Sequence, residues 1–263
     1  GVCPQKLEIY LKKIVIKRGK KSVNRFTKKT LKALIVVHVY GIPCKIHDIK
    51  KICKKFNLIL IEDAAEAVGS LYNGRHLGTF GDIGILSFNG NKAITTGAGG
   101  IIITNQGKIA AKLKHLSTHA KLKKKYDHLH DYIGFNYRMN NLSAAVGCAQ
   151  IENIRKILIA KRNNYKIYRR LFKDTKEIEI IKEPPNSKIN YWLIIAIFSN
   201  KKIRDKFVNL LNKKGYGVRY TWRPLHTLKI FKDCPADKMN NSLDIFNKTI
   251  NLPSSPSLSL KKK

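Results

Sequence analysis

The chain is short of acidic residues, paired cysteines and long apolar runs, and each shortage narrows its possible roles. Its 263 residues include 17 Asp and Glu against 52 Lys and Arg, a formal net charge of +35. No C-x-x-C pair occurs among the five cysteines, which argues against a disulfide framework or a zinc knuckle. No stretch resembles a signal peptide or is apolar for long enough to cross a bilayer. We therefore expect a cytoplasmic protein with reduced thiols and no metal site.

The basic excess has two interpretations. One is a surface for nucleic acid or an anionic membrane. The other is compositional bias, because the cations are mostly Lys, are spread along the chain and accompany abundant Ile and Asn, all encoded by AT-rich codons. Arg–aromatic interleaving, zinc-finger spacing and a helix-turn-helix signature are absent. We favour bias, expect no specific nucleic-acid partner and no membrane, and interpret residues 12–32 and 121–125 as solvated faces.

Hydrophobic spacing predicts an α/β chain with a mainly parallel sheet. Residues 31–38 and 58–61 read as buried strands on either side of a helix at 45–56, which makes a βαβ unit. Further strands are expected at 83–88 and 100–104, a helix at 105–115, and an uninterrupted helical pattern over 141–172. After the break at Pro184-Pro185-Asn186, a strand at 191–198 and a helix at 203–213 indicate an α+β portion. We expect a large domain over 1–155 and a smaller one over 156–263.

Three chemically useful side chains follow predicted strands. Asp63 ends one strand, and Ser87 and Lys92 follow another, at the sheet edge where ligands bind in open α/β folds. An amine, a carboxylate and a hydroxyl are what pyridoxal 5'-phosphate (PLP) requires for its aldehyde, its ring nitrogen and its phosphate. Taken singly, Asp63 could be only a helix cap, Lys92 a surface lysine, and the glycines over 97–100 a plain turn.

Six segments of the chain form a recognisable series: 37–41 (VHVYG), 61–67 (IEDAAEA), 78–82 (GTFGD), 86–97 (LSFNGNKAITTG), 134–139 (GFNYRM) and 250–256 (INLPSSP). Together they resemble the DegT/DnrJ/EryC1/StrS family of PLP-dependent sugar aminotransferases, and the likeness runs over residues 34–258. Within the family, the chain looks most like the branch acting on 4-keto sugars of legionaminic-acid-type pathways. The resemblance implies the aspartate aminotransferase-like fold type I.

The resemblance also implies roles for individual residues. Lys92 matches the Schiff-base lysine and Asp63 the acid that pairs with the pyridinium nitrogen. Glu66 matches a position beside the cofactor ring, and Ser87 matches a phosphate ligand. Asn136 matches an asparagine that reaches the phosphate from a neighbouring subunit, which implies a homodimer with shared sites. His226 is carried over only weakly, as a substrate-sugar contact. The implied reaction moves an amino group, from glutamate by family analogy, to a nucleotide-linked 4-keto-6-deoxy sugar for surface glycan synthesis.

The sequence departs from the family pattern at several points. Family members are longer at the N-terminus, so we expect a truncated chain that lacks the phosphate-gripping helix start. Ala98 stands where Glu or Gly is common, and Glu66 where Gln is common. We interpret His38 as structural, Asp82 and Arg138 as loop supports, and Trp222 as either core or a sugar platform.

Three alternatives stay open. A truncated inactive remnant of such an aminotransferase is the first. A PLP-dependent sugar dehydratase is the second, although that branch has His where this chain has Lys92. A nucleic-acid-binding protein is the third, supported only by the charge.

Overall fold

The computed structural model describes residues 1–124 and 126–260, and the chain divides into two compact units. The first comprises Gly1–Ile154 and Pro185–Ile189, and the second comprises Arg155–Pro184 and the chain from Asn190 onward. The segment after the Pro184-Pro185 break thus returns briefly to the first unit before the second unit continues. Lys125 and Lys261 to Lys263, part of the predicted basic clusters and tail, lie outside the described residues.

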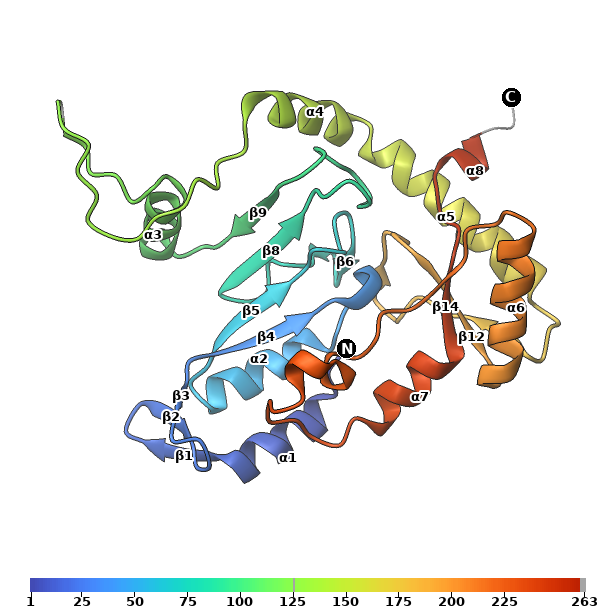
Figure 1. Ribbon diagram of the computed structural model, residues 1–263, viewed down its shortest axis with the longest axis horizontal. Coiled ribbons are helices and arrows are strands. Elements are labelled where there is room, and N and C mark those ends of the chain that lie inside the picture. The colour runs from blue at the N-terminus through green and yellow to red at the C-terminus, as the bar shows by residue number, and fades with distance from the viewer. Residues whose placement is uncertain (125, 261–263) are drawn as a thin grey trace. The chain divides into compact units, whose positions relative to one another are not determined.

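The first unit is built on a four-stranded sheet of order β4-β5-β8-β9 (Figure 1). Strands β4 (Ala33–Val37), β5 (Ile59–Asp63) and β8 (Ile83–Ser87) are parallel, and β9 (Gly100–Ile103) runs antiparallel to β8. Helix α2 (Ile46–Lys55) makes the crossover from β4 to β5. The predicted βαβ unit and the mainly parallel sheet are therefore confirmed.

Alternation along the strands divides the sheet into a buried and an open face. Val36, Leu60 and Leu86 are buried, whereas Ile35 and Ile59 on the opposite face are 62% and 42% exposed. Helix α2 contributes a buried apolar stripe of its own, made of Ile46, Ile49, Ile52 and Cys53. Full burial of each large apolar side chain contributes ~1.5–3 kcal/mol, so the buried face and α2 form the core that holds the strand ends in place.

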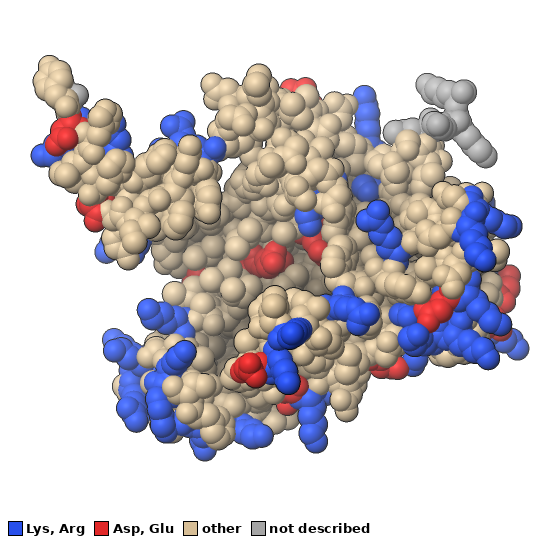
Figure 2. All heavy atoms as spheres, viewed as in Figure 1, with Lys and Arg blue, Asp and Glu red and all other residues tan. Residues whose placement is uncertain are grey.

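The first 32 residues fold, which the sequence did not lead us to expect. Helix α1 (Pro4–Ile14) precedes an antiparallel sheet of β1 (Val15–Arg18), β2 (Lys21–Asn24) and β3 (Thr30–Leu31). Ten Lys and Arg and no acid lie between residues 9 and 32, and all ten are exposed. Figure 2 shows basic side chains gathered over this region. They form the predicted solvated face, while Leu11, Ile14 and Val23 point inward.

The helical region after β9 differs from the prediction in one respect. Helix α3 (Gly107–Ser117) is followed by an irregular segment, residues 118–124 and 126–140, which we call the arm. The helix expected over 141–172 is not continuous, because α4 (Asn141–Glu152) ends at Glu152 and α5 (Ile154–Leu171) begins after Asn153, the residue between them. The Asn153 side chain donates to the Ala149 carbonyl at 2.9 Å, and asparagine bonding to local backbone favours helix termini over interiors.

Three short strands complete the first unit. Strands β6 (Leu71–Tyr72), β7 (Arg75–His76) and β11 (Ser187–Lys188) pair in the order β11-β6-β7. This pairing explains why Pro185–Ile189 belongs to the first unit.

The second unit is α+β, as predicted. Its antiparallel sheet has the order β10-β12-β14-β13, formed by β10 (Ile178–Ile180), β12 (Ile194–Phe198), β14 (Thr249–Leu252) and β13 (Arg219–Tyr220). The helices of this unit are α5, α6 (Lys201–Lys213), α7 (Asn240–Lys248) and α8 (Ser257–Leu260), with the 3-10 turns η2 (Leu225–Thr227) and η3 (Lys229–Phe231). Across the described parts of both units, each helix is too short or too polar to traverse a bilayer.

Candidate active site

Two polar residues end neighbouring parallel strands. Asp63 is the last residue of β5, and its Oδ1 accepts a hydrogen bond from the Ala65 amide at 3.1 Å. Ser87 is the last residue of β8, and its Oγ accepts from the Asn89 amide at 3.3 Å. Because β5 and β8 are parallel neighbours, both side chains belong to the carboxyl edge of the sheet. This is the edge at which open α/β folds bind ligands.

Lys92 lies in a turn that leaves β8 and returns as β9. The Lys92 amide donates to the Asn89 carbonyl at 3.0 Å, and the Thr96 amide donates to the Phe88 carbonyl at 3.0 Å. Ala93 and Ile94 are buried directly after it. The turn is therefore anchored on both sides of Lys92, whose own side chain is half-buried.

Glu66 joins this group from the segment after β5. Its Oε2 accepts a hydrogen bond from the Tyr40 amide at 2.6 Å. Burial raises the pKa of the Glu66 carboxyl, the Tyr40 amide and the Lys92 charge lower it, the Asp63 charge raises it, and the net pKa lies above 4.5. Glu66 thus lies close enough to both Lys92 and Asp63 for their charges to act on it.

His38, at the end of β4, has the structural role expected from the sequence. It is fully buried, and its Nε2 lies 2.9 Å from Oε2 of Glu62. Asp82 supports its surroundings as predicted, because its carboxylate accepts from the Leu60 amide at 2.8 Å and from the Gln106 side chain at 3.0 Å.

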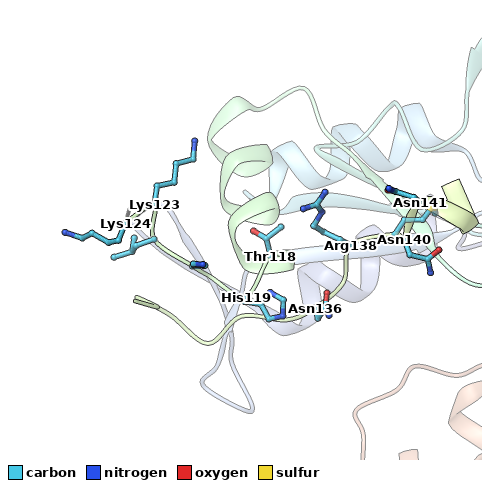
Figure 3. A pocket seen from close by; sticks show the side chains of 11 residues that line it. Thr118, His119, Lys123, Lys124, Asn136, Arg138, Asn140 and Asn141 are labelled. Atoms are coloured by element: carbon cyan, nitrogen blue, oxygen red, sulfur yellow. The ribbon is translucent and has the colours of Figure 1, made fainter. Parts of the chain in front are cut away.

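Asn136 does not line a pocket together with the other predicted cofactor ligands. It is exposed on the arm, where it forms an isolated antiparallel bridge with Thr118. Together with Arg138 and His119 it lines a wide, open groove of about 1220 Å³ (Figure 3). Asp63, Glu66, Ser87 and Lys92 do not line this groove.

His226 belongs to the second unit, in the turn η2. Its Nε2 is buried and has no hydrogen-bond partner within the described part of the chain. Nearby in sequence, Trp222 is 55% exposed and stacks on Trp192 with ring centroids 5.6 Å apart. Trp222 is therefore a surface aromatic rather than a core residue.

The residues at the sheet edge fit PLP as a donor set. Lys92 offers an amine, Asp63 a carboxylate for a protonated ring nitrogen, and Ser87 a hydroxyl for a phosphate. Asp63 and Ser87 end neighbouring parallel strands, Lys92 follows Ser87 in the chain, and the charges of Asp63 and Lys92 both act on Glu66. This combination is what the cofactor requires, whereas any one of these residues alone has a structural explanation.

Comparison with known proteins decides the family. A profile of the DegT/DnrJ/EryC1/StrS aminotransferase family matches residues 7–263.

The chain belongs to this family.

Its relatives include a GDP-perosamine synthase of Escherichia coli O157:H7, 37% identical over 235 residues, which cover 89% of this chain and 63% of that protein. Another is the UDP-4-amino-4,6-dideoxy-N-acetyl-beta-L-altrosamine transaminase of Helicobacter pylori, 25% identical over 91% of this chain and 65% of that protein. The chain thus spans less than two thirds of the length of these relatives.

A solved structure shows the same fold. Helicobacter pylori PseC, an aminotransferase involved in the biosynthesis of pseudoaminic acid, superposes with a TM-score of 0.83 over 88% of this chain and 63% of its own. At 24% identity this likeness concerns the fold alone. It agrees with the α/β, fold type I architecture expected for the chain.

Sequence reasoning missed one contributor to the site, the backbone amide of Tyr40. The sequence could not point to this group, because every residue except proline carries the same backbone N–H donor. Glu62 was also not singled out, although its strand pattern contains a clue. Leu60 and Glu62 share the buried face of β5, so the alternation places a carboxylate in the core.

Proposed function

We propose that this chain is a PLP-dependent sugar aminotransferase in which Lys92 holds the cofactor. The observation that carries the proposal is the position of Asp63 at the carboxyl end of β5, and of Ser87 and Lys92 at and after the end of its parallel neighbour β8, in a chain of this family. Bound PLP would supply an electron-withdrawing ring that accepts the electron pair left when a proton leaves the donor carbon.

Each residue of the chain then has a defined task. The Lys92 amine makes the covalent link and, when displaced, takes and returns a proton at its Nζ. The Asp63 carboxylate would pair with the protonated ring nitrogen of the cofactor. Ser87 binds a phosphate oxygen through its hydroxyl, and Glu66 lies beside the ring. The family resemblance assigns His226 a contact with the substrate sugar.

The proposed substrate is a nucleotide-linked 4-keto-6-deoxy sugar, aminated at carbon 4 with glutamate as the donor. Support comes from two relatives, a GDP-perosamine synthase and a transaminase whose name specifies a 4-amino-4,6-dideoxy sugar. The legionaminic-acid-type sugars are one group within this class. A role in surface glycan synthesis in the cytoplasm follows from the same proposal.

We also propose that two copies of the chain share their sites. Support comes from the arm, where Asn136 is exposed with aromatic neighbours, since Phe135 and Tyr137 stack at 5.1 Å and are 46% and 77% exposed. Exposed apolar groups of this kind mark interaction surfaces. In this arrangement Asn136 of one copy completes the phosphate site of the other.

The cofactor proposal is tested by locating the lysine that reacts. The chain is incubated with PLP, reduced with borohydride and digested, and modified peptides are identified by mass spectrometry. The labelled lysine must be identified by peptide mapping, because many surface lysines react weakly with PLP. We expect the label chiefly on Lys92, loss of the visible band in Lys92→Ala, and no change in the control Lys108→Ala, an exposed lysine of α3. A band that survives in Lys92→Ala refutes the assignment, and no band in the wild type favours the inactive remnant.

Shared sites are tested by mixing two inactive variants. Lys92→Ala retains Asn136, and Asn136→Ala retains Lys92, so a mixed dimer contains one intact site. We expect glutamate-dependent conversion of the cofactor to reappear in the mixture and to be absent from either variant alone. No recovery, together with a monomeric mass by light scattering, contradicts a shared site.

A further inference from the structure

We infer that Glu62 and His38 are positioning residues that hold the Tyr40 amide against Glu66 and so orient Glu66 in the site. This rests on the proposed function only in treating Glu66 as a site residue. The side chains of Glu62 and His38 are both fully buried. Their effect would travel through the turn that follows β4.

Glu62 is a buried carboxylate with a complete set of donors. Oε1 accepts from the amides of Phe80 at 2.6 Å and Gly81 at 2.5 Å. Oε2 accepts from the Gly78 amide at 3.0 Å and from Nε2 of His38 at 2.9 Å. Burial raises the pKa of Glu62, but the bonds from His38, Gly81 and Gly78 outweigh it, and the pKa lies below 4.5. Glu62 is therefore an ionised carboxylate in the core.

His38 makes a hydrogen bond through each of its ring nitrogens. Nε2 lies 2.9 Å from Oε2 of Glu62, and Nδ1 accepts from the Cys44 amide at 3.3 Å. His38 thus links the ionised Glu62 to the backbone on the far side of the turn, which returns at Cys44.

The turn held in this way presents the Tyr40 amide to Glu66. The His38 amide donates to the Asp63 carbonyl at 3.0 Å, and the Gly41 amide donates to the His38 carbonyl at 2.9 Å. Between them, Tyr40 adopts φ 59° and ψ 22°, a left-handed conformation that is unfavourable for a bulky residue. Such strain persists only where surrounding contacts over-determine it.

The contacts that over-determine Tyr40 come from both sides. His38 is fixed through its side chain by Glu62 and through its amide by Asp63. The Tyr40 amide then donates to Glu66 at 2.6 Å. The buried pair therefore connects to both acids of the site, to Asp63 through the backbone and to Glu66 through the turn.

The test measures amide hydrogen exchange at Tyr40 in the full chain without cofactor. In Glu62→Gln, the carboxamide nitrogen would replace either Oε1, facing the amides of Phe80 and Gly81, or Oε2, facing the Gly78 amide and Nε2 of His38. In either orientation two donors lose their acceptor. We expect the Tyr40 amide to exchange at least about tenfold faster than in the wild type. An unchanged Tyr40 rate in folded Glu62→Gln overturns the inference. If Glu62→Gln does not fold, His38→Gln is judged by the same rate.

Two control variants separate a local change at the Tyr40 amide from a general loss of stability. Asp48→Asn removes an exposed carboxylate of α2 and should leave the Tyr40 rate unchanged. Glu66→Ala removes the acceptor alone, so Tyr40 should exchange faster while the amides of Gly78, Phe80 and Gly81 keep their rates.

A measurement of PLP absorbance against pH distinguishes failure of this inference from failure of the proposed function. In Glu62→Gln we expect the pH midpoint of the PLP absorbance change to shift, because Glu66 loses its fixed orientation beside Lys92. An unshifted midpoint counts against the inference. Absence of the band in the wild type refutes the cofactor proposal instead, and the exchange result at Tyr40 is then decisive by itself.

Discussion

Glu62 in the first unit and Lys161 in the second are both buried charged residues, but their surroundings treat the charge in opposite ways. Glu62 is 0% exposed and accepts hydrogen bonds from His38 and three backbone amides. Lys161 is 5% exposed and donates only to the carbonyls of Trp192 at 3.2 Å and Ser254 at 3.0 Å. Within the described residues, no carboxylate pairs with Lys161.

Folding lowers the pKa of both groups, but it favours the charged form of Glu62 and disfavours the charged form of Lys161. For Glu62 a lowered pKa means that the folded state stabilises the charge, because the donors outweigh burial. For Lys161 burial alone lowers the pKa to about 8, so the folded state disfavours the charge. The comparison teaches that burial does not determine what a charge contributes; the number and sign of its partners do.

The largest effect is expected from Glu62→Leu, which replaces the carboxylate with an apolar side chain. Four buried donors lose their acceptor, so unfolding should become easier by about 3–5 kcal/mol, as when one partner of a buried pair is removed. Urea denaturation at neutral pH measures the change. A loss below about 1 kcal/mol would mean that the donors find other acceptors.

The next effect concerns Lys161 in alkali. Between pH 8 and 10.5 the unfolded chain keeps the Lys161 proton and the folded chain releases it, so the free energy of unfolding should rise with pH over this window. The shift from 10.5 to about 8 sets an upper limit of roughly 3 kcal/mol. Denaturation curves of wild type and Lys161→Met across the window give the contribution as a difference. Parallel curves would contradict it.

A smaller effect is expected from Lys161→Met at neutral pH. The replacement removes the unfavourable burial of the charge but leaves two carbonyls without this donor. These changes oppose each other, so the free energy of unfolding should stay within about 1 kcal/mol of wild type. Glu62→Leu, measured in parallel, supplies the contrast. If both variants lost the same free energy of unfolding, Glu62 and Lys161 would not differ in how their surroundings stabilise the charge.

The smallest effect is the acid dependence contributed by Glu62. Its folded pKa lies below the ordinary value of 4.5, so its contribution is present above that pH and is lost as pH falls through the folded pKa. Because burial and hydrogen bonds act in opposite directions, the net shift is limited. The difference in acid unfolding midpoint between wild type and Glu62→Gln measures it, and a less acid-sensitive wild type would reverse the sign.

Local sequence patterns were enough to predict the main sheet of the first unit and the α+β character of the second. Strands β4, β5 and β8 are β-branched runs bounded by turn residues, and α2 has a clear helical stripe. The patterns failed at α1 and β1–β3, where lysines on the solvent side obscure the few inward residues such as Ile14 and Val23. They also failed at Asn153, because a single helix break depends on a side chain bonding to nearby backbone.

The candidate site was predictable to the extent that it consists of side chains in recognisable runs. Asp63 and Lys92 could be chosen because residue type and strand-end position coincide. The groups around these residues could not be predicted from the sequence. The Tyr40 amide, for example, is a backbone group, and its partner Glu66 lies 26 residues away in sequence.

The sequence by itself was enough to indicate the family, the βαβ unit with its parallel strands and the candidate amine and acids, because these depend on local pattern and residue type. Only the tertiary structure decided which groups act on one another. In the folded chain, four donors bond to the Glu62 carboxylate, and the Lys161 amine donates to two backbone carbonyls. The same packing buried His38 between Glu62 and the Cys44 amide and gave Tyr40 its left-handed conformation. The physical reason is that a charge or a strained backbone is stabilised by partners distant in sequence, and these meet only when the chain has folded.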